Sequence, residues 1–138
     1  LPEAHLVGLI IGTILQIFLP IHLFQSLWIG HILGWPVIIL GMGLCAWAVI
    51  ETKEMNIEHP DELLTNGPYA ISRNPMYVGS TLIFLGISLI VNSVWMLTLV
   101  PAVIFYMHFV DVRQEEQLLE KRFGEEYRHY KTRVRRYL

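Results

Sequence analysis

Two long stretches without charged residues constrain this 138-residue chain more than any other feature. No Asp, Glu, Lys or Arg occurs in residues 6–50 or in residues 75–110. The whole chain is 54% hydrophobic and 16% charged, whereas soluble domains carry roughly 25% charged residues. A soluble domain of this size would need polar surface in both stretches. We therefore expect an all-α, polytopic membrane protein that forms a single domain over residues 1–138.

Each charge-free stretch is long enough for two membrane crossings, because a helix crosses the bilayer with about 20 apolar residues. The first stretch contains Gly30, Gly34 and Pro36, which we interpret as helix breakers. The second contains the polar pair Asn92-Ser93, which suits a tight turn. The sequence thus predicts a transmembrane helical bundle of about four spans, near residues 4–25, 33–52, 75–91 and 94–110.

All ten Lys and Arg residues lie outside these spans, in residues 53–74 and 111–138. Basic residues flanking membrane helices favour the cytoplasmic side. We therefore predict that loop 53–74, tail 111–138 and both termini are cytoplasmic. Within the tail, the fourth helix should run to about Phe123, end at Gly124 and be followed by a short helix.

The remaining composition narrows the classes of function. A net charge of -2 gives no basis for binding nucleic acid. The single Cys45 excludes an internal disulfide and a Cys-rich metal site. We predict no metal site, because the histidines lack metal-ligand spacing and are interpreted as structural or interfacial. They are His5, His22, His31, His59, His108 and His129.

A first cluster of notable residues precedes the third predicted helix. Asn74-Pro75 is typical of an N-cap followed by proline in the first helical turn. Tyr69, Arg73 and Tyr77 crowd the same helix start. Free N–H groups at a helix start attract an anion such as a carboxylate, and an adjacent arginine strengthens that attraction. The residues alone leave open a second interpretation, in which these three side chains lie at the lipid interface.

A second cluster is the pair Glu115-Glu116, just beyond the fourth predicted span. Neighbouring side chains on a helix point about 100° apart. The pair fits a solvated helix face, with Arg113 and Lys121 nearby. It also fits a site that holds an ammonium group or ribose hydroxyls.

A third cluster covers residues 123–134, which combine tyrosines with charges of both signs. On its own, this pattern is typical of an amphipathic surface helix that binds anionic lipid headgroups. We expect that lipid-binding role for Arg135 and Arg136 in particular.

The three clusters, in this order, resemble the isoprenylcysteine carboxyl methyltransferases and their prokaryotic relatives. Phospholipid N-methyltransferases are more distant relatives with a similar layout. The family pattern is G-P-Y…R-H/N-P-x-Y-x-G before a helix hairpin, then a Glu-Glu pair, then F-G-x-E-Y-x-x-Y-x-x-R-V. The matching segments are Gly67–Tyr69, Arg73–Gly79, Glu115-Glu116 and Phe123–Val134.

The resemblance implies an S-adenosylmethionine-dependent methyltransferase in a prokaryotic cytoplasmic membrane. Its acceptor would be lipophilic and membrane-associated, in the first place an isoprenylcysteine-like carboxylate. A phospholipid amine and a lipophilic thiol are the alternatives. The cofactor would bind from the cytoplasm, while the acceptor would enter from the bilayer among the membrane lipids. The oligomeric state stays open.

The resemblance also implies roles for individual residues. Arg133 and Glu116 are predicted to be catalytic. Methyl transfer from a sulfonium needs mainly alignment and exclusion of water. A carboxylate acceptor needs a cation such as Arg133 to position it, whereas an amine or thiol needs a proton acceptor such as a glutamate or tyrosine. The predicted cofactor-binding residues are Tyr69, Arg73, Asn74, Pro75, Tyr77, Gly79, Glu115, Glu116 and Tyr127.

Two non-enzymatic classes compete with this interpretation. A membrane scaffold protein would keep the spans but has no need for the three clusters. A small-molecule transporter usually places ionisable residues at mid-membrane. The predicted spans offer little of that kind beyond Gln16, His22 and His108, which disfavours transport.

Overall fold

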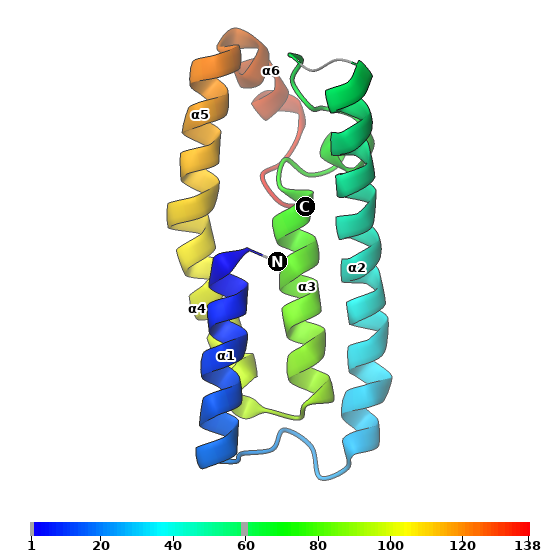
Figure 1. Ribbon diagram of the computed structural model, residues 1–138, viewed down its shortest axis with the longest axis vertical. Coiled ribbons are helices and arrows are strands. Elements are labelled where there is room, and N and C mark those ends of the chain that lie inside the picture. The colour runs from blue at the N-terminus through cyan, green and yellow to red at the C-terminus, as the bar shows by residue number, and fades with distance from the viewer. Residues whose placement is uncertain (1, 59–60) are drawn as a thin grey trace.

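The computed structural model describes residues 2–58 and 61–138, and its regular elements are helices. Four of them lie side by side along the long axis of the molecule (Figure 1). They are α1 (Glu3–Phe18), α2 (Leu27–Glu58), α3 (Pro75–Ile90) and α4 (Val94–Tyr106). A short 3-10 helix, η1 (Gly67–Ala70), precedes α3. A π-helical segment, η2 (Met107–Val112), joins α4 to α5 (Arg113–Phe123), and α6 (Glu125–Arg133) folds back beside α5. The all-α prediction is confirmed.

Two helices are long and apolar enough to cross a membrane, namely α2 and the continuous helix Val94–Phe123. The apolar helices α1 and α3 have 16 residues each. Each is therefore about 24 Å long, less than the roughly 30 Å of a bilayer core. Among the described residues, length and composition thus identify two candidate spans rather than four.

The first helix ends earlier than predicted, at Phe18 instead of residue 25. Pro20 is the reason, because a proline disfavours helical backbone in the residue before it. Leu19 accordingly has φ -135° and ψ 68°. The loop that follows is fixed by Asn92, whose Oδ1 accepts from Phe24 N at 2.7 Å and whose Nδ2 donates to Phe24 O at 2.8 Å. The predicted turn at Asn92-Ser93 is confirmed, with Asn92 at φ +57°.

The second helix does not break where the sequence predicted. Gly30, Gly34 and Pro36 all lie inside α2, which begins at Leu27 instead of residue 33. A Cβ on Gly34 would lie 2.7 Å from the carbonyl oxygen of Gly86 in α3. These glycines therefore allow two helix backbones to approach closely, as small residues do in membrane helix pairs. Membrane helices also tolerate an internal proline when neighbouring groups compensate for the lost hydrogen bond.

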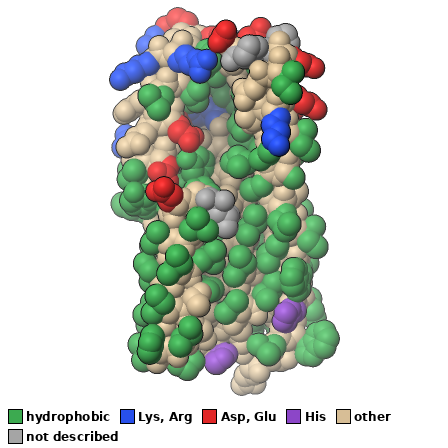
Figure 2. Space-filling view, viewed as in Figure 1, with side chains coloured by type: hydrophobic (Ala, Val, Ile, Leu, Met, Phe, Trp, Pro, Cys, Tyr) green, Lys and Arg blue, Asp and Glu red, His purple; other side chains and the backbone are tan. Residues whose placement is uncertain are grey.

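The end of the molecule that carries α5 and α6 collects the charged side chains, whereas hydrophobic side chains cover most of the rest of the visible face (Figure 2). Gly124, at φ +56°, separates α5 from α6 as predicted. One expectation for this end needs correction. Helix α2 continues to Glu58, so the start of the predicted loop 53–74 is helical. In α6, Tyr127 and Tyr130 pack in a buried cluster with Leu63. His59 lies outside the described residues.

Candidate active site

The candidate site lies at the start of α3, where this helix meets the preceding loop, α5 and the C-terminal tail. Two cavities of about 420 and 140 Å³ meet there. Four residues line both of them, namely Tyr69, Arg73, Asn74 and Glu115. Binding sites for small molecules typically measure roughly 300–1,000 Å³. In Figure 2 the visible face is hollowed in the upper part, between the ends of α5 and α2.

Asn74 occupies the N-cap position of α3, as predicted, but its side chain does not cap the helix. Instead, Asn74 Nδ2 donates to the carbonyl oxygen of Arg136 at 3.0 Å. The backbone N–H of Asn74 donates to Ser72 Oγ at 3.1 Å. The capping role predicted for the Asn74 amide is therefore wrong, and the amide ties the tail to the start of α3.

The two adjacent glutamates of α5 point to different partners, as expected from their angular separation. Glu115 Oε1 accepts a hydrogen bond of 2.8 Å from the hydroxyl of Tyr77, at the exposed rim of the larger cavity. Glu116 turns inward and is only 9% exposed. The pair thus places one carboxylate at the cavity mouth and one in the protein interior.

Glu116 binds two arginines. Its Oε1 accepts from Arg73 Nη1 at 3.2 Å and from Arg136 Nε at 2.8 Å, and its Oε2 accepts from Arg136 Nη2 at 3.0 Å. The hydrogen bonds from Arg136 to Glu116 raise the pKa of the Arg136 guanidinium, which keeps this group charged. A buried carboxylate is tolerated only when it is paired and hydrogen-bonded in this way. Glu116 therefore fastens α5, the start of α3 and the tail to one another.

The tail after α6 crosses the start of α3. Arg73 N donates to the carbonyl oxygen of Arg135 at 2.9 Å, and Tyr137 Oη lies 2.7 Å from His108 Nδ1. The lipid-headgroup role expected for Arg136 is wrong in this structure, because its guanidinium is bound to Glu116. Sequence reasoning missed this residue because nothing local separates Arg136 from Arg133 and Arg135.

Buried tyrosines form the wall on the side of α6. Tyr127 is 1% exposed and lines the smaller cavity together with Leu63. Tyr130 donates from its hydroxyl to the carbonyl oxygen of Tyr69 at 2.5 Å. Burial raises the pKa of Tyr69, Tyr127 and Tyr130, so all three remain neutral hydrogen-bond donors at physiological pH.

Eight of the ten predicted site residues line the two cavities. They are Tyr69, Arg73, Asn74, Pro75, Tyr77, Glu115, Glu116 and Tyr127. Gly79 does not line either cavity, because it packs against α2, where an added Cβ would lie 2.8 Å from the carbonyl oxygen of Gly41. Arg133 is exposed at the end of α6 and does not line them either. The structure thus brings together the residues near α3 and α5 but not these two.

The profile of the phospholipid methyltransferase family matches residues 29–126, which include η1, the start of α3 and both glutamates. The chain belongs to the phospholipid methyltransferase family. The resemblance inferred from the three clusters is thereby confirmed at the level of the family. Tyr127, Arg133 and Arg136 lie beyond the matched residues.

A curated relative is similar over part of the chain. It is the phosphatidyl-N-methylethanolamine N-methyltransferase of Saccharomyces cerevisiae, which is 46% identical over 56 residues. The match covers 41% of this chain and 27% of the yeast protein. No solved structure matches the chain.

Proposed function

We propose that this protein is an S-adenosylmethionine-dependent methyltransferase that methylates the amine headgroup of a phospholipid. The choice of acceptor rests on which charged side chains of the site are already paired and which one is not. Arg73 and Arg136 both bind Glu116. Glu115, in contrast, is contacted only at Oε1 among the described residues, which leaves Oε2 to meet a cation.

The cavities suit the cofactor in size and in the chemistry of their walls. The carboxylate of Glu115 at the rim would attract the positively charged sulfonium. Apolar side chains of Leu63, Leu64 and Leu119 line the smaller cavity and would cover an adenine ring. The bound cofactor supplies an activated methyl group, so the protein's main tasks are to align the acceptor and to exclude water.

An amine acceptor also needs a group that takes up its proton before the nitrogen attacks. Glu115 is the candidate, because a proton acceptor within hydrogen-bond reach of the reacting nitrogen provides general-base catalysis. The hydroxyl of Tyr77 fixes the orientation of this carboxylate through its 2.8 Å hydrogen bond. Tyr77 thereby positions the proposed base without accepting the proton itself.

The isoprenylcysteine-like carboxylate, the first acceptor expected from the resemblance, has less support. Such an acceptor needs a cation to hold it, and both arginines that line or border the cavities already bind Glu116. The yeast relative is named as an N-methyltransferase, an enzyme that methylates an amine. Both points favour the phospholipid amine over the carboxylate.

The test is transfer of a labelled methyl group in vesicles that contain phosphatidylethanolamine or its monomethyl or dimethyl form. We expect Glu115→Gln to lower turnover about 10²- to 10⁴-fold, the usual contribution of a general base. The matched control is Glu125→Gln on α6, where the carboxylate pairs with Arg128 at the surface. Labelling of an isoprenylcysteine acceptor but of no phospholipid would overturn the proposed acceptor.

We further infer four membrane crossings with both termini in the cytoplasm, as the distribution of basic residues predicts. The short helices α1 and α3 lie alongside α2 and α4, and the bilayer would have to thin, or flanking side chains would have to reach outward, to accommodate them. Cysteines introduced by Val91→Cys, at an exposed position of the turn after α3, and by Asn56→Cys in a Cys45→Ala background provide the test. Labelling of both positions from the same side of the membrane would contradict this topology.

A further inference from the structure

We propose that an apolar groove between α3 and α4 holds an acyl chain of the acceptor lipid. The groove has a volume of about 230 Å³. The proposal rests on the proposed function for the identity of the headgroup, but it concerns a separate surface. The walls of the groove include Val78 and Leu82 from α3, Ile104 from α4 and Met107 from η2.

The groove adjoins the proposed headgroup site at one side chain. Tyr77 lines both the larger polar cavity and the apolar groove. Its hydroxyl contacts Glu115, while its ring forms part of the apolar wall. A lipid whose amine lies at Glu115 can therefore place an acyl chain directly in the groove. Two compartments of opposite polarity that meet at one tyrosine match the two ends of an amphiphile.

The backbone supports a functional role for this groove independently. The helix that carries Ile104 changes to π-helical geometry over Met107–Val112. Single π-helical turns inside α-helices occur frequently at functional sites. Met107 begins this segment and lines the groove. The irregular turn therefore begins at a wall of the apolar groove.

The C-terminal tail joins the two compartments. Arg136 binds Glu116 beside the polar cavities, and the next residue, Tyr137, lines the apolar groove. Tyr137 is held by His108, with Oη and Nδ1 2.7 Å apart. The tail thus contributes a wall to the acyl site and an ion pair to the headgroup site. We expect changes in tail position to alter both together.

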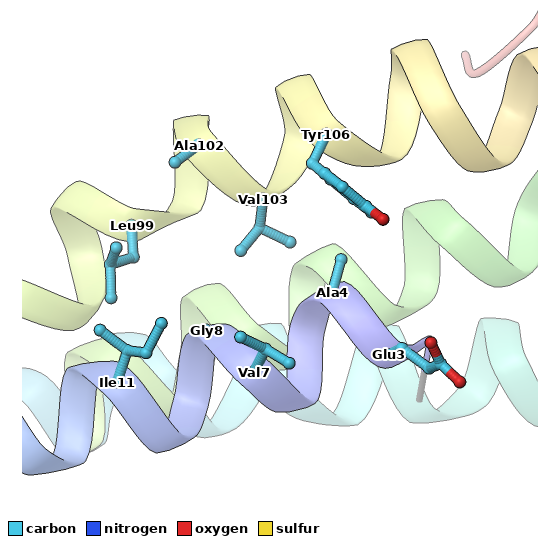
Figure 3. Close-up of a pocket in the computed structure, with 9 residues that line it drawn as sticks. All are labelled: Glu3, Ala4, Val7, Gly8, Ile11, Leu99, Ala102, Val103 and Tyr106. Carbon is cyan, nitrogen blue, oxygen red and sulfur yellow. The ribbon is translucent and has the colours of Figure 1, made fainter.

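A second apolar groove provides the natural control. It lies between α1 and α4 and is larger, about 380 Å³, with Val7, Ile11 and Leu99 among its lining residues (Figure 3). Among the described residues, none lines both this groove and either polar cavity. A chain bound there would have no side chain in common with the proposed headgroup site. The two grooves therefore make different predictions although both are apolar.

The first experiment measures binding without requiring methyl transfer. A phosphatidylethanolamine with a photoreactive diazirine in its acyl chain is incorporated into vesicles with the full chain, and labelled peptides are identified after irradiation. We expect labelling of α3 and η2 near Leu82 and Met107, and its loss in the presence of excess unlabelled phosphatidylethanolamine. Labelling confined to lipid-facing positions, without competition, would overturn the acyl site even if the protein proves to be a methyltransferase.

The second experiment narrows each groove in turn. Leu82→Trp fills the α3–α4 groove, and Ile11→Trp is the matched change in the α1–α4 groove. Losing contact with about two methylene groups lowers affinity about tenfold. We expect Leu82→Trp to raise KM about tenfold for a long-chain acceptor while KM for a short-chain acceptor and cofactor affinity stay unchanged, with little effect from Ile11→Trp. An equal change in both variants, or a change only in Ile11→Trp, would overturn the assignment.

Discussion

The apolar part of the bundle and its charged end are held together by different forces. In the apolar part, α2 and α3 approach so closely that an added Cβ on Gly34 would lie 2.7 Å from a carbonyl oxygen of the facing helix. The charged end relies on Glu116 and its two arginines and on the buried tyrosines of α6. One region thus depends on the absence of side-chain volume, and the other on specific polar partners.

This difference explains why the polar cavities lie at the charged end. The close backbone contact between α2 and α3 leaves no room for a ligand between those two helices, whereas side chains that meet through long arginine contacts leave space between the elements. Eight predicted site residues line that space. We therefore expect substitutions between α2 and α3 to act mainly on folding and those at the charged end to act on binding as well.

The largest loss of stability is expected from Gly34→Leu. The added side chain would meet the backbone of α3, which cannot move aside as a flexible side chain would. We expect the free energy of unfolding to fall by about 3 kcal/mol, at the upper end of the usual cost of overpacking. The control is Gly43→Leu in the same helix, because a Cβ on Gly43 would meet nothing within 4 Å. Equal unfolding temperatures of the two variants in detergent would refute the role of close backbone contact.

Glu116→Ala should have the next largest effect. It leaves Arg73 and Arg136 without their carboxylate, and an unpaired buried charge is costly. We expect a loss of about 2–3 kcal/mol, less than for a fully buried pair because the Arg136 side chain is 36% exposed. Glu120→Ala is the control, since its partners lie at the surface and its removal should leave the unfolding transition unchanged. Similar transitions for both variants would show that the inner ion pairs do not hold this end together.

A smaller effect is expected from Asn74→Ala, which removes the hydrogen bond to the carbonyl oxygen of Arg136. One such bond contributes about 1 kcal/mol. Asn74→Ser should not restore this stability, because the serine hydroxyl is too short to reach the tail. Full recovery of the unfolding temperature by serine would instead support a capping role for Asn74.

The change in stability expected at the tail is no larger than that of Asn74→Ala. Arg136→Lys replaces a bidentate contact by a single point charge and should cost about 1 kcal/mol. Arg133→Lys should not change the free energy of unfolding, because Arg133 is exposed. Turnover is measured on both variants. Loss of turnover in Arg133→Lys alone would support the catalytic role predicted from the resemblance, and loss in Arg136→Lys alone would show that turnover depends on the ion pair with Glu116.

Several features could be predicted because they depend on local sequence. Asn92 and Gly124 end helices through backbone conformations with positive φ, which their residue types favour. The start of α3 at Pro75 follows from the fixed φ of proline. The absence of charge in residues 6–50 and 75–110 predicts apolar helices whatever their partners. The candidate site was predicted because Arg73–Tyr77 and the glutamate pair, two short segments, resemble the motifs of a methyltransferase family.

The helical, apolar character of the chain, the collection of its charges at one end and most of the cavity lining could therefore be predicted from the order of the residues. The tertiary structure alone decided that Gly34 joins two helices rather than ending one, since that depends on Gly86 in another helix. It also decided that Arg136, rather than Arg133, pairs with Glu116. Both outcomes rest on contacts between residues far apart in the chain, and no local propensity distinguishes one glycine or one arginine from its neighbours.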